Sequence, residues 1–187
     1  MPENPFLKAL YRWRVRTAFF AFLFVLVLAE PTVVSIGVGI LISLAGLAVR
    51  TWASGHLRKD KSLAVSGPYR YTRNPLYLGN FILGISLSVG SHSLWVGAVF
   101  AVYFLMFYPA IVHVERERMK TLFPGEYDAY RRFVPLFFPF RRPLRGRGAP
   151  FSWKLYARNR EYRALIGTAV FWAVMAVKLL LHLPSPF

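Results

Sequence analysis

The 187-residue chain contains no cysteine, and only 8 of its residues are acidic against 24 Lys and Arg. Without cysteine, a disulfide framework, a thiolate nucleophile and a zinc–thiolate site are all excluded. The four histidines are widely separated, and the chain has no HExxH motif or phosphate-binding glycine loop. No Ser-His-Asp arrangement can be assembled from the spacing either. We therefore expect neither a metal site nor a catalytic triad.

Apolar residues are what the chain has in excess. Hydrophobic residues make up 56% of it and aromatic residues 17%, and the mean hydropathy is +0.40. Five apolar segments can be delimited: 15–29, 32–53, 75–89, 94–112 and 164–183. Each is about long enough, or nearly so, to cross a bilayer as a helix, and backbone in lipid must satisfy its own hydrogen bonds. The sequence therefore predicts an all-α membrane protein with about five transmembrane helices.

The basic residues predict the orientation of these helices. Of the 24 Lys and Arg residues, 23 fall in the blocks 8–16, 50–73 and 116–163. Five spans would place all three blocks on one side, which the positive-inside rule makes cytoplasmic. We therefore expect the N-terminus inside and the C-terminus outside. The charge excess then needs no nucleic-acid partner, and Lys178, near the far end of the last helix, is expected to snorkel to the interface.

A proline-punctuated polar stretch, 67–79, precedes the third apolar segment. Asn74 and Pro75 suit the cap and first position of a helix, so a helix is predicted to begin at Pro75. Arginines and tyrosines crowd this stretch, among them Tyr69 and Arg73. Two interpretations remain open: an interfacial belt that anchors the helix, or a polar pocket at the cytoplasmic mouth of the bundle, built on free backbone N–H groups.

Small residues recur at four-residue spacing in the second and third apolar segments, which predicts close packing of these helices. The two sets are Ser35, Gly39 and Ser43, and Asn80, Gly84 and Ser88.

Two polar stretches follow the fourth apolar segment. Residues 112–120 are predicted to continue that helix beyond the membrane. Residues 123–135 are predicted to form a short amphipathic helix with Tyr127, Tyr130 and Val134 on one face. Glu115 and Glu117 are two residues apart and so point about 200° from each other, which leaves at most one facing the bundle interior. From the residues alone, a solvated helix end is favoured for both.

The motifs of these stretches together resemble the isoprenylcysteine carboxyl methyltransferase family, whose wider group includes the phospholipid methyltransferases. The matching motifs are Ser66-Gly67-Pro68-Tyr69, Arg73-Asn74-Pro75-x-Tyr77-x-Gly79, Glu115, and Phe123-x-x-x-Tyr127-x-x-Tyr130-x-x-x-Val134-Pro135. The resemblance covers about residues 50–140. It implies an integral membrane enzyme that uses S-adenosylmethionine, with its active site at the cytosolic mouth of the helices.

The resemblance also implies the residues of the site. Arg73 and Glu115 are the candidate catalytic residues. The candidate cofactor contacts are Lys61, Ser62, Leu63, Ala64, Tyr69, Asn74, Pro75, Leu76, Tyr77 and Glu115.

Three positions depart from the family pattern. Asn74 replaces the usual histidine, and Arg116 replaces the second of two adjacent glutamates. Ile111 stands where the prenylcysteine enzymes have an arginine that pairs with the substrate carboxylate. A carboxylate needs a cationic partner in a dry pocket, so a neutral or amine-bearing acceptor is expected, with Arg73 or Arg131 the alternative partners for an acidic one. Residues 151–183 fall outside the resemblance and are expected only to complete the bundle.

We therefore expect residues 1–187 to form a single membrane domain. Its expected activity is methyl transfer from S-adenosylmethionine to a lipophilic small molecule or lipid at a bacterial inner membrane. Three alternatives remain: an isoprenylcysteine-type carboxyl O-methyltransferase, an NADPH-dependent enzyme like the membrane sterol reductases, and a non-catalytic helical protein. Its partners would be the bilayer and the lipophilic substrate, without nucleic acid. The oligomeric state stays open.

Overall fold

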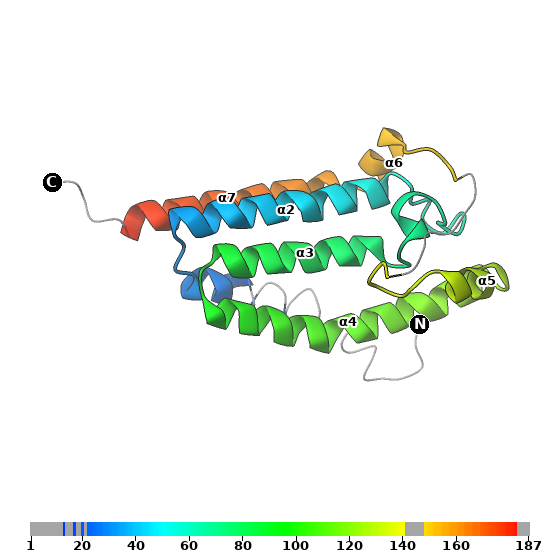
Figure 1. Ribbon diagram of the computed structural model, residues 1–187, viewed down its shortest axis with the longest axis horizontal. Helices are drawn as coiled ribbons and strands as arrows, with labels where there is room; N and C mark the ends of the chain where they lie inside the picture. The colour runs from blue at the N-terminus through cyan, green and yellow to red at the C-terminus, as the bar shows by residue number, and fades with distance from the viewer. Residues whose placement is uncertain (1–12, 14–16, 18–19, 21, 141–147, 183–187) are drawn as a thin grey trace.

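A computed structural model describes residues 13, 17, 20, 22–140 and 148–182, and every regular element among them is a helix (Figure 1). The elements are α2 (Val33–Ser54), the 3₁₀ helix η1 (Gly67–Arg70), α3 (Pro75–Gly90), α4 (Leu94–Leu122), α5 (Glu126–Phe133), α6 (Trp153–Arg158) and α7 (Tyr162–His182). Residues 22–28 are also helical and belong to the first expected segment, most of which lies outside the described residues. The predicted all-α class is confirmed.

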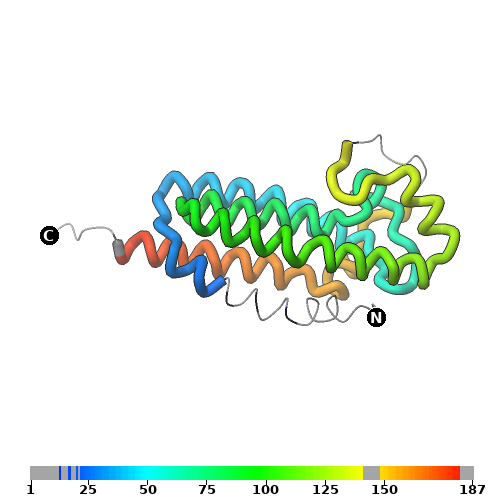
Figure 2. Tube along the Cα trace, turned by 90° about the horizontal axis from the view of Figure 1, so that it is seen from below, coloured from blue at the N-terminus to red at the C-terminus, as the bar shows by residue number. Residues whose placement is uncertain are grey.

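The four long helices run side by side along the long axis of the molecule (Figures 1 and 2). The short elements η1, α5 and α6 gather at one end, on the right of Figure 1. At the other end lie the start of α2, the turn between α3 and α4, and the end of α7. This arrangement places the polar connections of the described chain together at one end of an apolar bundle.

Three helices, α2, α4 and α7, are long and apolar enough to cross a membrane. Large apolar side chains such as Leu94, Leu105 and Leu180 are exposed on the outside of the bundle, where a bilayer would cover them. The protein is therefore an integral membrane protein. Helix α3 is apolar but has only 16 residues, so the number of five spans stays a prediction.

Helices α2 and α3 pack through glycine. A Cβ atom on Gly39 would lie 3.0 Å from both the Cα of Gly90 and the carbonyl oxygen of Ser86. One on Gly46 would lie 3.1 Å from the carbonyl oxygen of Gly79. The predicted stripe on the second helix is confirmed at Gly39 and at Ser35, whose Oγ donates to the Gly90 carbonyl oxygen at 3.0 Å, whereas Ser43 meets Trp172 of α7.

The stripe predicted on the third helix is confirmed at two of its three residues, which face α4: Gly84 lies against Phe100, and a Cβ atom on Gly97 would lie 4.0 Å from Cβ of Ser88. The third residue, Asn80, is exposed. Small residues occur on two faces of α3, and the face with Ser86 and Gly90 is the one that meets α2. Spacing alone does not distinguish the two faces.

Helix α7 is fixed to α2 by a buried aromatic cluster. Phe171, Trp172 and Met175 pack with Ala29, and the indole Nε1 of Trp172 donates to Ser43 Oγ at 3.1 Å. This hydrogen bond, buried between the two helices, fixes the register of α7 against α2.

Lys178, expected to snorkel to the interface, forms hydrogen bonds within the described chain, and its snorkelling stays a prediction. Its ammonium donates to the carbonyl oxygens of Leu26 and Val27, at 2.7 and 3.0 Å. Those carbonyls end the helical residues 22–28 and have no partner further along the helix. Lys178 therefore stabilises a helix C-terminus.

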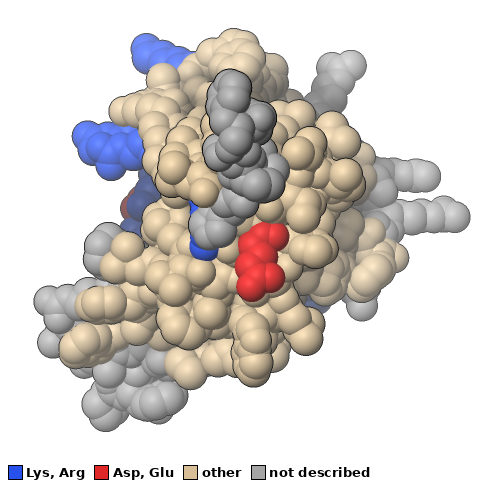
Figure 3. Space-filling view, turned by 90° about the vertical axis from the view of Figure 1, so that its left-hand side faces the viewer, with Lys and Arg blue, Asp and Glu red and all other residues tan. Residues whose placement is uncertain are grey.

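The described Lys and Arg residues other than Lys178 lie at the end of the bundle with η1, α5 and α6. Figure 3 shows the opposite end, whose described surface is mostly uncharged, with one small acidic patch, a little basic surface beside it, and basic side chains at the edge of the view. This separation agrees with the charge blocks, although the block 8–16 lies outside the described residues. That the charged end faces the cytoplasm stays a prediction.

Two predictions at the charged end are confirmed. Helix α4 continues through the polar residues to Leu122. Tyr127 and Tyr130 of α5 and Val134, the residue after it, are buried in one cluster against Leu63, Met119 and Phe123.

Candidate functional site

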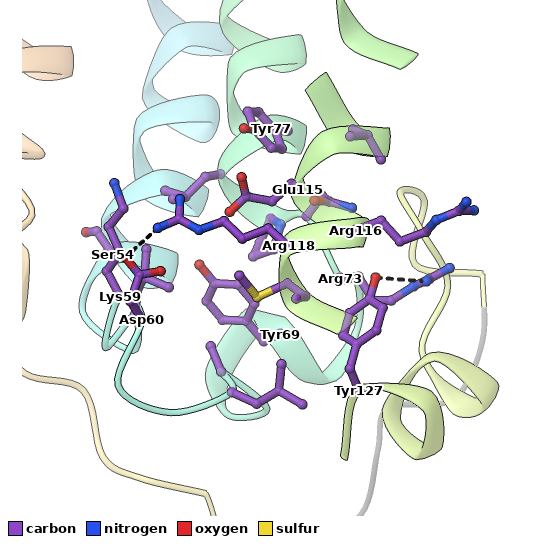
Figure 4. A pocket seen from close by; sticks show the side chains of 18 of the residues that line it. Ser54, Lys59, Asp60, Tyr69, Arg73, Tyr77, Glu115, Arg116, Arg118 and Tyr127 are labelled. Carbon is purple, nitrogen blue, oxygen red and sulfur yellow. Dashed lines mark hydrogen bonds and ion pairs between the residues drawn. The ribbon is translucent and has the colours of Figure 1, made fainter. Parts of the chain in front are cut away.

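A cavity of about 380 Å³ opens at the charged end, between the end of α2, the 55–66 loop, η1, the start of α3 and the end of α4 (Figure 4). Its volume lies in the range of small-molecule sites. The lining mixes apolar residues such as Leu63, Val112 and Met119 with several charged side chains.

The 67–79 stretch builds one wall of this cavity. Gly67 has a φ of +57°, and a Cβ atom there would lie 2.4 Å from the ring of His56, so only glycine fits the turn. Tyr69 is buried, and its carbonyl oxygen accepts a 2.6 Å hydrogen bond from the Tyr130 hydroxyl. The Arg73 N–H donates to the Pro135 carbonyl at 3.0 Å. These bonds fix the stretch to the segment that contains α5.

Asn74 precedes α3 as predicted, but its side chain does not cap the helix. Its Nδ2 donates instead to the Leu136 carbonyl oxygen at 2.9 Å. The asparagine thus ties the start of α3 to the chain after α5, and the predicted capping hydrogen bond is wrong.

The motif glycine Gly79 is required by the packing of α3 on α2. A Cβ atom there would lie 2.4 Å from Cγ of Arg50 and 2.9 Å from the Gly46 carbonyl oxygen. Glycine therefore lets the stem of Arg50 pass between the helices toward the cavity.

Glu115 faces the cavity from α4 (Figure 4). No described residue forms a hydrogen bond or ion pair with its carboxylate. Glu117 is exposed and accepts from Lys120 and Arg116 at 2.9 and 3.0 Å. The inference that at most one of the two glutamates faces the interior is confirmed, and a solvated helix end describes Glu117 only.

Arg73 also lines the cavity without a carboxylate partner among the described residues. Its Nη1 donates to the Tyr127 hydroxyl at 3.3 Å, while its Nε is buried with no acceptor in the described part of the chain. An orphaned charged donor in such a place is suited to an anionic group of a ligand.

Tyr69 is the third polar group of this wall. Burial raises the pKa of its hydroxyl well above the usual value, and Tyr130 and Glu115 nearby act in the same direction. Tyr69 is therefore protonated at physiological pH and is a hydrogen-bond donor toward the cavity.

Of the eleven residues implied by the resemblance, ten line the cavity, and Lys61, which is exposed, does not.

Arg131, one of the two arginines considered for an acidic acceptor, is exposed and paired with Asp128 at 2.7 Å, away from the lining. Ile111 is half-buried and outside the lining. The lining does include the cations Arg50 and Arg73, and the expected neutral or amine-bearing acceptor stays a prediction.

Several lining residues were not found by sequence reasoning: Arg50, Asp60, Asn80, Arg118, Asn159 and Glu161. Arg118 and Asp60 form a 2.6 Å ion pair across the cavity, from α4 to the 55–66 loop (Figure 4). The Nδ2 of Asn159 donates to the carbonyl oxygens of Ser54 and Leu57, both at 2.9 Å. One signal was available, because Arg50 is the single charged residue of α2.

Comparison with known proteins bears on this site. The model of a family described as phospholipid methyltransferase matches residues 24–126, more than half of the chain. The chain belongs to the phospholipid methyltransferase family. The family is one of membrane methyltransferases, and this is the reaction class that membership gives the chain. The matched range includes the motif stretch and Glu115 and ends before α6.

Two relatives are named for metal resistance. The cobalt-zinc-cadmium resistance protein CzcN of Cupriavidus metallidurans is 34% identical over 63% of this chain and 54% of its own length. The nickel-cobalt-cadmium resistance protein NccN of Alcaligenes xylosoxydans xylosoxydans is 36% identical over 48% of this chain and 43% of its own. The chain thus spans about half the length of these relatives. No solved structure matches it.

Among the described residues of this phospholipid methyltransferase family member, no group of three or more His, Asp or Glu side chains could hold a metal ion.

Proposed function

We propose that the protein transfers a methyl group from S-adenosylmethionine to a lipophilic acceptor, at this cavity and on the cytoplasmic side of a bacterial inner membrane. One observation carries the proposal. Glu115 and Arg73, two side chains of opposite charge without ion-pair partners among the described residues, line one partly apolar cavity at the charged end of a membrane bundle. Family membership gives the reaction class.

The residues present fit the cofactor. S-adenosylmethionine carries an ammonium and a carboxylate on its methionyl part and hydroxyls on its ribose. Glu115 would accept from the ribose hydroxyls or the ammonium, and the free donors of Arg73 would take the carboxylate. Tyr69 would donate a further hydrogen bond, and the apolar residues Leu63 and Met119 would contact the adenosine.

When bound, the cofactor supplies a methyl group that its sulfonium has already activated. The chain itself then has three tasks: to hold the cofactor, to exclude water, and to align the acceptor. The buried cluster of Tyr127, Tyr130 and Val134 closes the side of the cavity next to α5. The Arg118–Asp60 ion pair crosses it on the side of the 55–66 loop.

The test is cofactor binding and methyl transfer by purified protein in lipid nanodiscs. S-adenosylhomocysteine should bind and raise the melting temperature, and NADP should do neither. Tritium from labelled S-adenosylmethionine should appear in the organic phase after incubation with a bacterial lipid extract. Binding of NADP in place of S-adenosylhomocysteine would instead support the reductase alternative.

The names of the relatives suggest a cellular test. We propose that any contribution of this protein to metal tolerance depends on methyl transfer. In a deletion strain that has become sensitive to cobalt or cadmium, the wild-type gene should restore growth and Glu115→Gln should not. Restoration by an equally expressed Glu115→Gln variant would contradict the link.

A further inference from the structure

A buried ion pair lines the cavity next to Gly79, the last residue of the 67–79 stretch. The Nε of Arg50, near the end of α2, donates to Oε1 of Glu161, just before α7, at 2.5 Å. The two side chains are only 16% and 8% exposed. The Nη1 of Arg50 donates to Oδ1 of Asn80 on α3. Three parts of the chain therefore meet at one guanidinium.

Stability alone does not explain this pair. Replacing a buried ion pair by well-packed apolar residues often leaves a protein as stable or more stable, because both charges lose their hydration. Arg50 lies four residues before the end of α2, in the basic block at the charged end, so burial of the two charges within the protein is what calls for an explanation. Arg50 is the single charged residue of α2, and both it and Glu161 line the cavity.

The hydrogen-bonding capacity around Arg50 is not used up. Its Nη2 has no acceptor among the described residues. The hydroxyl of Tyr108 is buried and also lacks a partner in the described part of the chain. Tyr108 interacts electrostatically with Arg50, and its ring meets that of Tyr77, a lining residue, at 5.1 Å. Free donors thus remain next to a cavity where no described side chain satisfies them.

We propose that this pair forms the acceptor-headgroup subsite of the cavity. Arg50 donates to an oxygen of the acceptor's polar head, and Glu161 is the positioning residue that holds the guanidinium. The inference rests on the proposed function, which assigns 62–64, Tyr69, 74–77 and Glu115 to the cofactor and so leaves the lining residues Arg50, Asn80 and Glu161 for the acceptor.

The chemistry of the guanidinium indicates the class of head group. Arginine has only donors, and its planar fork matches carboxylate and phosphate oxygens. The subsite therefore favours a lipophile whose head carries a carboxylate or phosphate over one that carries only an amine. It also gives the connection between α6 and α7, which lies beyond the family match and contains Glu161, a part in specificity.

The test measures binding of probes that share one tail. Hexadecanoate and hexadecyl phosphate are compared with hexadecylamine on protein in nanodiscs, with and without S-adenosylhomocysteine. Wild-type protein should bind the two anionic probes more tightly. Arg50→Gln and Glu161→Gln should each reduce that preference at least about tenfold and leave the dissociation constant of S-adenosylhomocysteine within about twofold. Glu117→Gln, outside the cavity, should keep the wild-type preference.

Either single variant leaves one buried charge without its partner and can misfold. The double variant Arg50→Gln/Glu161→Gln removes both charges of the pair, so neither is left buried without its partner. It should therefore keep its fold and still lose the preference for the anionic probes. Comparison between variants removes the nonspecific attraction of anions to a basic protein.

An unchanged preference in the folded double variant would overturn the proposal. An equal loss of S-adenosylhomocysteine affinity would assign the pair to the cofactor instead and would also overturn it. Failure of wild-type protein to bind S-adenosylhomocysteine would count against the proposed function alone. The probe preference measured without that ligand would then still decide whether the headgroup subsite exists.

Discussion

Glu115 and Glu117 provide a matched pair of substitutions on one helix. Glu115→Gln removes a carboxylate that faces the cavity and has no partner among the described residues, so it breaks no internal ion pair. Glu117→Gln removes the same charge from an exposed position next to Lys120. Both variants change the net charge of the protein equally. Any difference between them therefore reports the position of the carboxylate.

The expected magnitude follows from the interaction that is lost. A hydrogen bond to a charged group contributes about 1.5–3 kcal/mol. Glu115→Gln should therefore weaken S-adenosylhomocysteine binding by about 10- to 150-fold, since about 1.4 kcal/mol corresponds to a factor of ten. The ion pairs of Glu117 are exposed and screened by solvent, so they contribute little to stability. Glu117→Gln should leave the affinity within about twofold.

Isothermal titration calorimetry on protein in nanodiscs measures both constants. The melting temperature without ligand is the control for folding, and Glu115→Gln should not lower it. At a fixed ligand concentration, the ligand-induced rise in melting temperature should shrink in Glu115→Gln alone, because the stabilisation by a ligand increases with the logarithm of 1 + [L]/Kd. Equal effects of the two substitutions on affinity would refute the assignment of Glu115 to the cofactor.

Three further predictions use other parts of the bundle. In this cysteine-free chain, a cysteine at the exposed His92 should react with an impermeant thiol reagent in intact cells and one at the exposed Ser62 should not; the opposite pattern would reverse the orientation. Gly39→Ala should destabilise the protein by about 1–3 kcal/mol through overpacking, whereas Gly37→Ala, where a Cβ meets nothing within 4 Å, should be neutral or slightly stabilising in thermal unfolding. Burial lowers the pKa of His56 from its usual 6.5, so the unfolded chain takes up a proton at a higher pH than the folded chain does. The free energy of unfolding should therefore fall as the pH drops below about 6.5. If a folded His56→Gln variant lost as much stability in acid, another group would be responsible for the pH dependence.

Local patterns predicted the features that depend on neighbours along the chain. The start of α3 at Pro75 follows from the restricted φ of proline at a first helical position. The buried face of α5 follows from the spacing of Tyr127 and Tyr130. Glu115 was assigned by resemblance, and its orientation relative to Glu117 followed from helical periodicity.

Contacts between distant segments were not predictable in the same way. Arg50 and Glu161 are separated by 111 positions, and no periodic pattern connects them. The amide of Asn74 satisfies an acceptor after α5, at Leu136, where a sequence pattern predicted a local cap. Such choices depend on which polar group is left unsatisfied once the helices have packed.

The separation of Arg50 from Glu161 has a consequence for biogenesis. At synthesis rates of about 5–20 residues per second, α2 leaves the ribosome roughly 6–20 seconds before its carboxylate partner, 111 residues later, exists. Asn80 becomes available after 30 residues and can accept from the guanidinium meanwhile. An insertion intermediate therefore holds an uncompensated cation at the edge of the membrane until the α6–α7 segment arrives. Chains truncated before Glu161 would retain that charge, so they should be preferred targets for membrane proteases that recognise unpaired polar groups.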